Sequence, residues 1–550
     1  MKKSLFALGI FAMAASSFAA NPRFFATEPA NKWTDAWPLG NGRLGALVFG
    51  QIGKETLELN ETSIWAPPQD IPVNENGPEI LKQIRELLLT DKPHAAEQMT
   101  QNQFLMAAEK VSSYQPLATL TIDHKGQGDV SAYNREIVLP EGYVKTTYTQ
   151  GGTAYTRTAW ADSNADVLVF DYKAENGTLN FTVNANRQGA TVKVLGNNKL
   201  HLSGSTGNKG VAYDMVLEVK VKGGKVAPEG NGIAVTGASA ATIRVAARTD
   251  YNFKDPTKPL TRNRLSACQK DLSGKANLAA HAKKFAAKFN QSYVTIPYSY
   301  TENPKSVQQL LNEAKSTKKI SNDLLVLYYD YCRYLILSAS RKGGMPANLQ
   351  GIWNPLMNPP WDSDFHLDIN LSMFYWPAPQ WGLYEEMEPM VSFAEMGFKA
   401  SEPIAKKMLG VPEGGFMVTS TDAWGYAVPF RLPCWGMYVV GGAWLLQDAE
   451  RAWYVSHDPE LRKRLLPLFK SQATFYKHWM IRNKEGKLAS GPVVSPENSY
   501  RGADGNAAVD LGPAHEQELI QATLKSILAI NPKDKLANDL LKDLALPKIA

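Results

Sequence analysis

Two patterns of hydrophobic and polar positions divide the chain. Within residues 143–248, short runs alternate hydrophobic and polar side chains, for example at 167–170, 179–183, 215–221 and 241–245. Alternating residues point to opposite faces of a strand, and closely spaced strands joined by turns are typical of an antiparallel sandwich. Similar short runs lie within residues 45–59. We therefore expect an N-terminal antiparallel β-sandwich with a helical insertion near residues 79–99.

The spacing of the hydrophobic residues changes near Leu272. Leu278, Ala282, Phe285 and Phe289 recur at helical spacing, which predicts a helical linker. We expect further helices at 307–314, 323–340, 390–408, 437–454, 460–480 and 513–530. Segment 324–337 is apolar on most sides, which favours a helix buried at the centre of a helical toroid.

These patterns predict a multidomain β + α protein. We expect a signal peptide over residues 1–20, a β-sandwich domain over 21–270, a helical linker over 271–300 and a helical catalytic domain over 301–550. The leader prediction rests on Lys2 and Lys3, the apolar run at 5–15 and small residues before Asn21. A secreted or periplasmic product is expected, and no later apolar run is long enough to predict a membrane span.

Composition narrows the function classes. The 550 residues are 44% hydrophobic and 10% aromatic, so the chain can bury a large core and is not a disordered protein. The net charge of +6 includes two leader lysines, and without a dense basic run we expect no nucleic-acid partner. Three cysteines cannot all pair within one chain, and eight histidines show no metal-ligand spacing. We therefore expect no disulfide framework, no metal and no cofactor.

A glycine motif at residues 40–45 reads GNGRLG and matches a dinucleotide-binding pattern. That pattern works where the glycines lead into a helix, because the helix N-terminus binds the phosphates. Here they lead into a strand-like run at 46–49. We expect tight turns that bring this loop close to another domain.

The loop at residues 346–379 combines tryptophans, amides and acids between predicted helices. Trp353 and Trp361 offer flat faces for the apolar C–H groups of a sugar, while His366, Asp368 and Asn370 offer partners for its hydroxyls. Long loops in compact domains often carry function, so we expect a carbohydrate site here. The alternative is a structural plug, in which the tryptophans fill the mouth of a barrel and the amides cap helices.

Two further clusters repeat this combination of residues. Asp422 and Trp424 lie in the polar segment 419–425, and Glu497 and Asn498 lie in the turn 495–500. An isolated Glu497 would more often be a surface or capping acid. In a pocket walled by tryptophans, loss of solvent would raise its pKa and make it a proton donor. We take Trp353, Trp361, His366, Asp422, Trp424 and Asn498 as candidate sugar contacts.

Short blocks occur in a fixed order along the chain: PLGNGRLGA at 38–46, LELNET at 57–62, PANLQGIWN at 346–354, NPPW at 358–361, YWPA at 375–378 and SPEN at 495–498. Together they resemble the inverting α-L-fucosidases of glycoside hydrolase family 95. The resemblance implies a β-sandwich, a helical linker, an (α/α)6 barrel and a C-terminal β domain. Because the chain ends soon after the predicted helix that follows Glu497, we expect the barrel to be incomplete.

The resemblance also implies roles for individual residues. Glu497 corresponds to the general acid, and Asp368 and Asn370 correspond to an Asn-x-Asn pair that orients and deprotonates water. The first asparagine of that pair is an aspartate here. His366 matches the position that faces the terminal carbon of the sugar, where histidine goes with fucose.

Three functions therefore stay open. The first is release of terminal α-L-fucose from a fucosylated oligosaccharide or polysaccharide by single displacement. The second is a catalytically impaired carbohydrate-binding fragment. The third is a glycoside phosphorylase with the same barrel, which ranks last because the tryptophan loop carries no basic cluster for phosphate.

Overall fold

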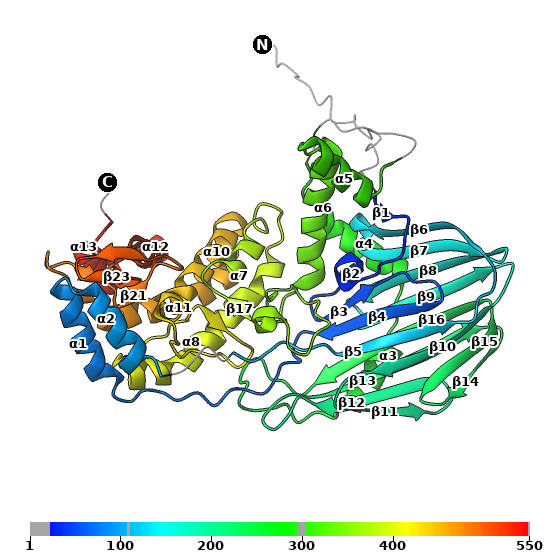
Figure 1. Cartoon of the computed structure of the whole chain (residues 1–550), viewed down its shortest axis with the longest axis horizontal. Helices are drawn as coiled ribbons and strands as arrows, with labels where there is room; N and C mark the ends of the chain where they lie inside the picture. The colour runs from blue at the N-terminus through cyan, green and yellow to red at the C-terminus, as the bar shows by residue number, and fades with distance from the viewer. Residues whose placement is uncertain (1–22, 107–110, 295, 297–303, 548–550) are drawn as a thin grey trace, which may run out of the picture.

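The computed structural model describes residues 23–106, 111–294, 296 and 304–547, so the predicted signal peptide lies outside the described residues. Strands occupy one end of the molecule and most helices the other (Figure 1). Two antiparallel sheets form the sandwich, in the orders β1-β6-β7-β8-β9-β16-β13-β12-β11 and β14-β15-β10-β5-β4-β3-β2. Their strands are β1 (Phe24–Ala26), β2 (Trp37–Gly40), β3 (Leu44–Val48), β4 (Lys54–Glu61), β5 (Ala118–His124), β6 (Val130–Val138), β7 (Tyr143–Gln150), β8 (Thr153–Asp162), β9 (Val167–Glu175), β10 (Leu179–Asn186), β11 (Ala190–Leu195), β12 (Lys199–Ser205), β13 (Ala212–Lys222), β14 (Lys225–Glu229), β15 (Gly232–Ala238) and β16 (Ala240–Thr249).

The alternating pattern explains how the two sheets pack. Leu57 and Phe181 from the seven-stranded sheet, and Leu217 and Ile243 from the other, are buried in one hydrophobic cluster. Leu217 pairs with Val245 across the β13–β16 ladder, so their side chains lie on the same face. The predicted strands at 167–170, 179–183, 215–221 and 241–245 are confirmed in β9, β10, β13 and β16.

Two linker helices, α3 (Arg264–Ser273) and α4 (Leu278–Phe289), follow the sandwich. Helix α4 confirms the helical spacing predicted for residues 278–289, whereas α3 begins before the change predicted near Leu272. The side chains of Asn263 and Asn277 accept hydrogen bonds from the first turns of these helices, as N-caps do. Cys268 and Leu272 of α3 are buried with Trp160 in a second, smaller cluster against the nine-stranded sheet. The linker therefore packs against the sandwich.

The helical domain follows the predicted order of helices. The predicted helices at 307–314, 323–340, 390–408, 460–480 and 513–530 are confirmed within a few residues. None of the described helices combines the length and hydrophobicity that a membrane span needs. The helices are α5 (Val307–Thr317), α6 (Asn322–Ala339), α7 (Asn370–Tyr375), α8 (Glu388–Met408), α9 (Pro433–Gly436), α10 (Gly441–Ser456), α11 (Pro459–Trp479), α12 (Ala514–Ile530) and α13 (Lys535–Asp543), and the short turns are η1 (Trp33–Asp35), η2 (Thr100–Phe104), η3 (Leu139–Glu141), η4 (Pro360–Ser363) and η5 (Glu385–Met387).

The helix predicted at 437–454 begins at Gly441 instead. The backbone before Gly441 pairs with other segments of the chain. The carbonyl of Met437 accepts a hydrogen bond from the N–H of Val494 at 2.9 Å, and Val440 forms a parallel β-bridge with Met417. Backbone groups that pair with other segments cannot also form the first turn of a helix.

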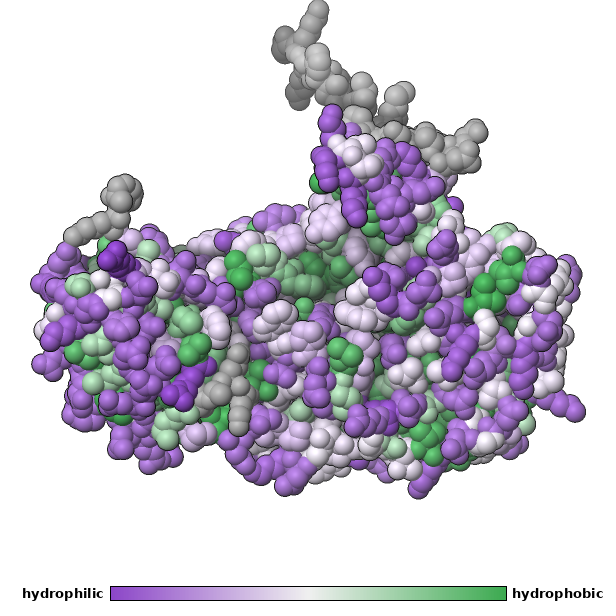
Figure 2. Space-filling model, in the orientation of Figure 1, coloured by the Kyte–Doolittle hydropathy of each residue, from purple (hydrophilic) through white to green (hydrophobic). Residues whose placement is uncertain are grey.

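Helix α6 does not lie buried at the centre of a toroid, so that expectation is wrong. It packs against α4, α5 and β2, and its Leu325 and Tyr328 are 49% and 64% exposed. Figure 1 shows α6 beside the sandwich and α12 at the far end of the helical domain. The surface is hollowed beside α5 and α6, and hydrophobic side chains gather there (Figure 2).

The glycine motif lies in the turn between β2 and β3, where it meets the end of α6. A Cβ atom on Gly40 would lie 2.4 Å from the carbonyl oxygen of Ser338, and Gly42 has a φ of +78°. The N–H of Gly42 donates to the same carbonyl at 2.8 Å. These contacts confirm the expectation of tight turns that bring this loop close to another domain. A larger side chain at these positions would prevent the approach.

The insertion consists of α1 (Gly77–Leu89) and α2 (Pro93–Met99), which lie at the far end of the molecule from the sandwich (Figure 1). The Arg85 guanidinium donates to the carbonyl oxygens of Gly491 and Trp479, at 2.9 and 2.7 Å. The carboxylate of Asp504 accepts from the N–H groups of His94 and Ala95, at 2.9 and 3.0 Å. A segment inserted in the sandwich sequence therefore supports the C-terminal part of the helical domain.

Candidate active site

A cavity of about 760 Å³ in the helical domain brings together residues that are far apart in the sequence. Asp368 and Asn370 precede and begin α7, while Glu497 comes from a segment before α12. All three predicted catalytic residues line the cavity, as do the predicted sugar contacts Trp361 and His366. The lining residues are Leu349, Gln350, Pro360, Trp361, His366, Asp368, Ile369, Asn370, Trp444, Pro496, Glu497 and His515.

The loop that carries His366 and Asp368 is held by a short antiparallel pair. Strand β17 (Phe365–His366) pairs with β18 (Ser420–Thr421), and the N–H of Leu367 donates to the carbonyl of Thr419 at 2.6 Å. The polar segment at 419–425 therefore supports the loop through its backbone.

A buried carboxylate orients His366. Asp364 is fully buried, and its carboxylate pairs with Nδ1 of the His366 ring. Such a contact fixes the ring orientation and determines which nitrogen faces the cavity. Asp364 was not among the predicted site residues. Its place two positions before His366 could have indicated a carboxylate that pairs with the ring.

Asp368 has the electrostatic features of a proton acceptor. Burial raises the pKa of its carboxyl; the nearby His366 lowers it, and the charge of Glu497 raises it again. Its Oδ1 atom is buried and has no hydrogen-bond partner among the described residues. An unpaired buried carboxylate oxygen is costly, so this atom is suited to bind a water molecule or a hydroxyl.

Glu497 lies on an arm formed by two short antiparallel pairs. Strand β21 (Val493–Val494) pairs with β24 (Val509–Asp510), and β22 (Tyr500–Gly502) with β23 (Gly505–Ala507). The Glu497 side chain is exposed. It is therefore not enclosed by tryptophans, and the burial on which its predicted role as a desolvated acid depended is absent.

Trp361 occupies a turn with unusual backbone geometry. Trp361, Asp362 and Ser363 have φ values of +47°, +54° and +49°, a region that residues other than glycine rarely adopt. The turn is held because the Asp362 carbonyl accepts from the N–H of Tyr114 at 2.9 Å and Ser363 donates to Asn348 at 2.9 Å. It places the Trp361 ring, 74% exposed, at the edge of the cavity.

Trp353 does not line the cavity. It is 6% exposed, and its indole N–H donates to the carbonyl oxygen of Leu39 in β2 at 2.9 Å. Its ring also lies against Gly45, where an added Cβ would be 3.1 Å from Nε1. The structure therefore places Trp353 in the contact between the sandwich and the helical domain.

Asp422, Trp424 and Asn498 also lie outside the lining of the cavity. The buried Asp422 carboxylate accepts from the N–H groups of Ser112 and Trp424, at 2.7 and 2.9 Å. The Trp424 indole donates to the carbonyl of Ala66 at 2.8 Å, and Asn498 is exposed. Asp422 and Trp424 thus connect the helical domain to the segments around α1 and α2.

Two lining residues, Trp444 of α10 and His515 of α12, were not predicted. Each lies inside a segment with ordinary helical periodicity, and neither belongs to the polar and aromatic clusters of the loops. The sequence carried no local signal for them.

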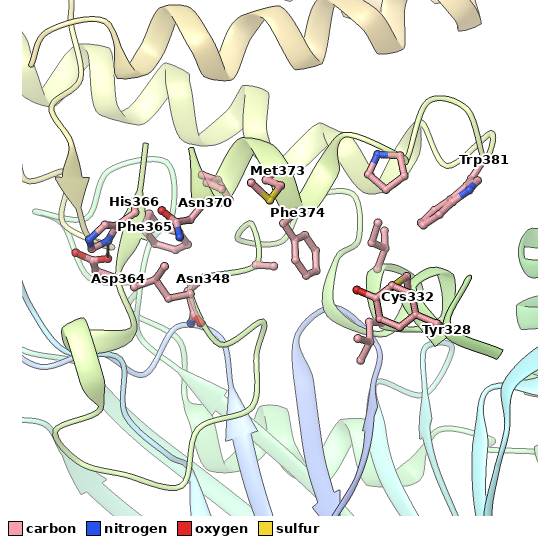
Figure 3. Close-up of a pocket in the computed structure, with 16 residues that line it drawn as sticks. Tyr328, Cys332, Asn348, Asp364, Phe365, His366, Asn370, Met373, Phe374 and Trp381 are labelled. Carbon is pink, nitrogen blue, oxygen red and sulfur yellow. Dashed lines mark hydrogen bonds and ion pairs between the residues drawn. The ribbon is translucent and has the colours of Figure 1, made fainter. Parts of the chain in front are cut away.

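A second cavity of about 400 Å³ adjoins the first and shares Leu349, His366 and Asn370 with it. Figure 3 shows His366, Asp364 and Asn370 at one end and Tyr328, Cys332 and Trp381 at the other. The polar site therefore continues into a mainly apolar cleft between α6 and α7.

Comparisons with known proteins agree with this architecture. The glycosyl hydrolase family 95 catalytic domain matches residues 273–546, and the glycosyl hydrolase family 65 N-terminal domain matches residues 24–254. A putative kojibiose phosphorylase from the human microbiome has a similar fold, with a TM-score of 0.59 and 11% identity over 96% of this chain and 71% of that one.

Two curated relatives are similar along most of the chain. "Alpha-L-fucosidase 2" of Arabidopsis thaliana is 29% identical over 93% of this chain, and "Probable alpha-fucosidase A" of Aspergillus niger is 28% identical over 88%. The chain spans 65% and 64% of the length of these relatives.

Proposed function

The chain belongs to glycoside hydrolase family 95 through its residues 273–546, and on that premise we propose that it releases terminal α-L-fucose from glycans by an inverting single displacement. The names of the two curated relatives support the choice of fucose. The observation that carries the proposal is the cavity in which Glu497, Asp368 and Asn370 meet.

Inversion requires an acid on one side of the glycosidic bond and a base with room for water on the other. Glu497, on its exposed arm, is accessible to the leaving part of a glycan, and a glycan bound against it would exclude the water that surrounds its side chain. In that complex Glu497 protonates the leaving oxygen. Asp368 and Asn370 lie at the start of α7, where they hold the water. Asp368 takes the water proton, because its raised pKa makes its carboxylate a stronger base than an exposed one.

The lining of the cavity supports hydrolysis over phosphorolysis. Phosphate is usually bound by arginine, lysine or clustered N–H groups, since it carries a concentrated negative charge. Among the described residues that line the cavity there is no lysine or arginine.

The substitution Glu497→Gln tests the proposed acid. We expect turnover of a fucosylated oligosaccharide to fall by roughly 10²- to 10⁴-fold, because proton donation to a poor leaving group is lost. An aryl fucoside with an activated leaving group should lose much less, and L-fucose should still bind. NMR of the product should show β-L-fucose first if the reaction inverts.

Other outcomes would identify the alternatives. Equal losses on both substrates would mean that Glu497 has a structural role. A parent chain that binds L-fucose but releases none would be a carbohydrate-binding protein, and release only in the presence of inorganic phosphate would indicate a phosphorylase.

We also propose that the protein is exported to the periplasm or the medium, on the basis of the leader-like sequence at residues 1–20. Mass spectrometry of exported protein should then give an N-terminus near Ala20 or Asn21. Exported protein that keeps Met1 would contradict the proposal.

A further inference from the structure

His515 places an imidazole in the same cavity as the predicted catalytic residues. It lies in the first turn of α12 and lines the cavity with Glu497, Asp368 and Trp444. The proposed reaction uses the carboxylates of Glu497 and Asp368 for its proton transfers and does not require this imidazole.

The ring of His515 is held in one orientation. Its Nε2 atom lies 3.1 Å from the hydroxyl oxygen of Tyr438, with a hydrogen bond between them. The ring stacks on Tyr438, with centroids 5.7 Å apart and an angle of 25°, and lies 4.9 Å from the ring of Trp444. Tyr438 is fully buried, so it is a rigid support.

This arrangement leaves the other ring nitrogen for a ligand. Within the described part of the chain, Nδ1 of His515 makes no hydrogen bond, while Nε2 is occupied by Tyr438. Burial lowers the pKa of His515, so the ring is neutral at neutral pH and does not compete with Glu497 as an acid. A neutral imidazole can exchange a hydrogen bond with a sugar hydroxyl, and Trp444 beside it offers an apolar face.

We propose that His515 is a sugar-binding residue of this cavity, which holds a hydroxyl group of the substrate through Nδ1 while Tyr438 fixes the ring through Nε2. This proposal rests on the proposed glycosidase function and adds a contact from α12 to those from the α7 loop and the Glu497 arm. It assigns His515 to binding and leaves proton transfer to the carboxylates.

The substitution His515→Phe tests the proposal, because phenylalanine keeps a ring against Tyr438 and Trp444 but has no nitrogen. We expect a roughly 3- to 10-fold rise in KM for an aryl fucoside and in Kd for L-fucose, as expected for one lost hydrogen bond. The kcat should change by less than about 2-fold. His515→Asn should show a smaller rise in KM and Kd than His515→Phe, because its amide can reach the same hydroxyl. Tyr438→Phe should show a rise between those of the parent and His515→Phe.

A control variant is His478→Phe in α11, whose histidine lies near Glu413 and does not line the cavity. It should bind L-fucose as the parent does. Thermal unfolding of each variant separates lost folding from lost binding, and His515→Asn replaces His515→Phe if the latter fails to fold.

Three results would overturn the proposal. Unchanged KM and Kd in His515→Phe would show that the imidazole does not contact the sugar. A loss of kcat with an unchanged Kd would assign His515 to proton transfer instead. A parent chain that neither binds L-fucose nor cleaves fucosides would overturn the proposed function together with this inference.

Discussion

At the scale of single residues, the proposed reaction depends on position 368. An amide there could only orient a water molecule, whereas the carboxylate of Asp368 can also remove its proton. Its raised pKa and its unpaired Oδ1 atom agree with that role. In the proposed reaction, Asn370 would then orient the water and His366 the sugar.

The substitution Asp368→Asn should therefore lower kcat by roughly 10²-fold or more, because the proposed general base is lost. In the parent, activity should rise with pH as Asp368 loses its proton, and the midpoint should lie above that of an exposed aspartate because the folded-state pKa is raised. The variant should lack this acidic limb in its pH–rate profile. A variant as active as its parent would show that Asp368 is not the base.

At the scale of elements, the arm that carries Glu497 depends on a distant insertion. Asp504, in the turn between β22 and β23, accepts hydrogen bonds from two N–H groups in the first turn of α2. The first N–H groups of a helix have no partners within it, so this contact satisfies them and fixes the arm. The arm in turn sets the position of Glu497.

The substitution Asp504→Ala should loosen the arm and lower the activity without unfolding the domain. Hydrogen exchange at the amides of β22, β23 and α2 should become faster, because the two N–H groups lose their acceptor. Asp504→Asn, which keeps an acceptor oxygen, is the matched control and should behave more like the parent. Unchanged exchange at these amides in Asp504→Ala would contradict the supporting role of α2.

At the scale of the whole molecule, a half-buried ionic cluster joins the sandwich to the helical domain. Asp166, in the turn between β8 and β9, pairs with Arg43 at 3.0 Å, Arg248 at 3.0 Å and Arg341 at 2.9 Å. Burial alone would raise the pKa of Asp166, but Arg43 and Arg341 hold it well below its usual value. Arg341 follows α6, so the cluster crosses the domain boundary beside the glycine motif.

The substitution Asp166→Asn should reduce the free energy of unfolding by about 2 kcal/mol, because Arg341 loses its ion pair across the domain boundary, while Arg43 keeps Glu61 and Arg248 keeps Asp271. Urea unfolding followed by tryptophan fluorescence measures this change. Asp171→Asn is the control, since Asp171 bonds Thr242 within the sandwich and an amide oxygen can still accept that bond. Equal stability of both variants would show that the cluster does not stabilise the joined domains.

Much of the fold was determined by local sequence. The strands at 167–170, 179–183, 215–221 and 241–245 and most of the helices follow from the period of the hydrophobic residues, because that period reflects which face of an element is buried. Strands β5 and β6 lie outside the segments in which strands were predicted. The cavity-lining residues of the loop 346–379 and of the turn at Glu497 were also recognisable as candidates, because tryptophans, amides and acids gather in these segments. These signals require no knowledge of which segments meet in space.

Tertiary structure decided the rest. It placed Trp353 and Asp422 in structural contacts, left Glu497 exposed and brought His515 and Trp444 into the cavity. It also left one face of α6 open, although the sequence of that helix is apolar on most sides. Burial and proximity are properties of the packed chain, and residues with the same local pattern can face a core, a partner domain or a cavity.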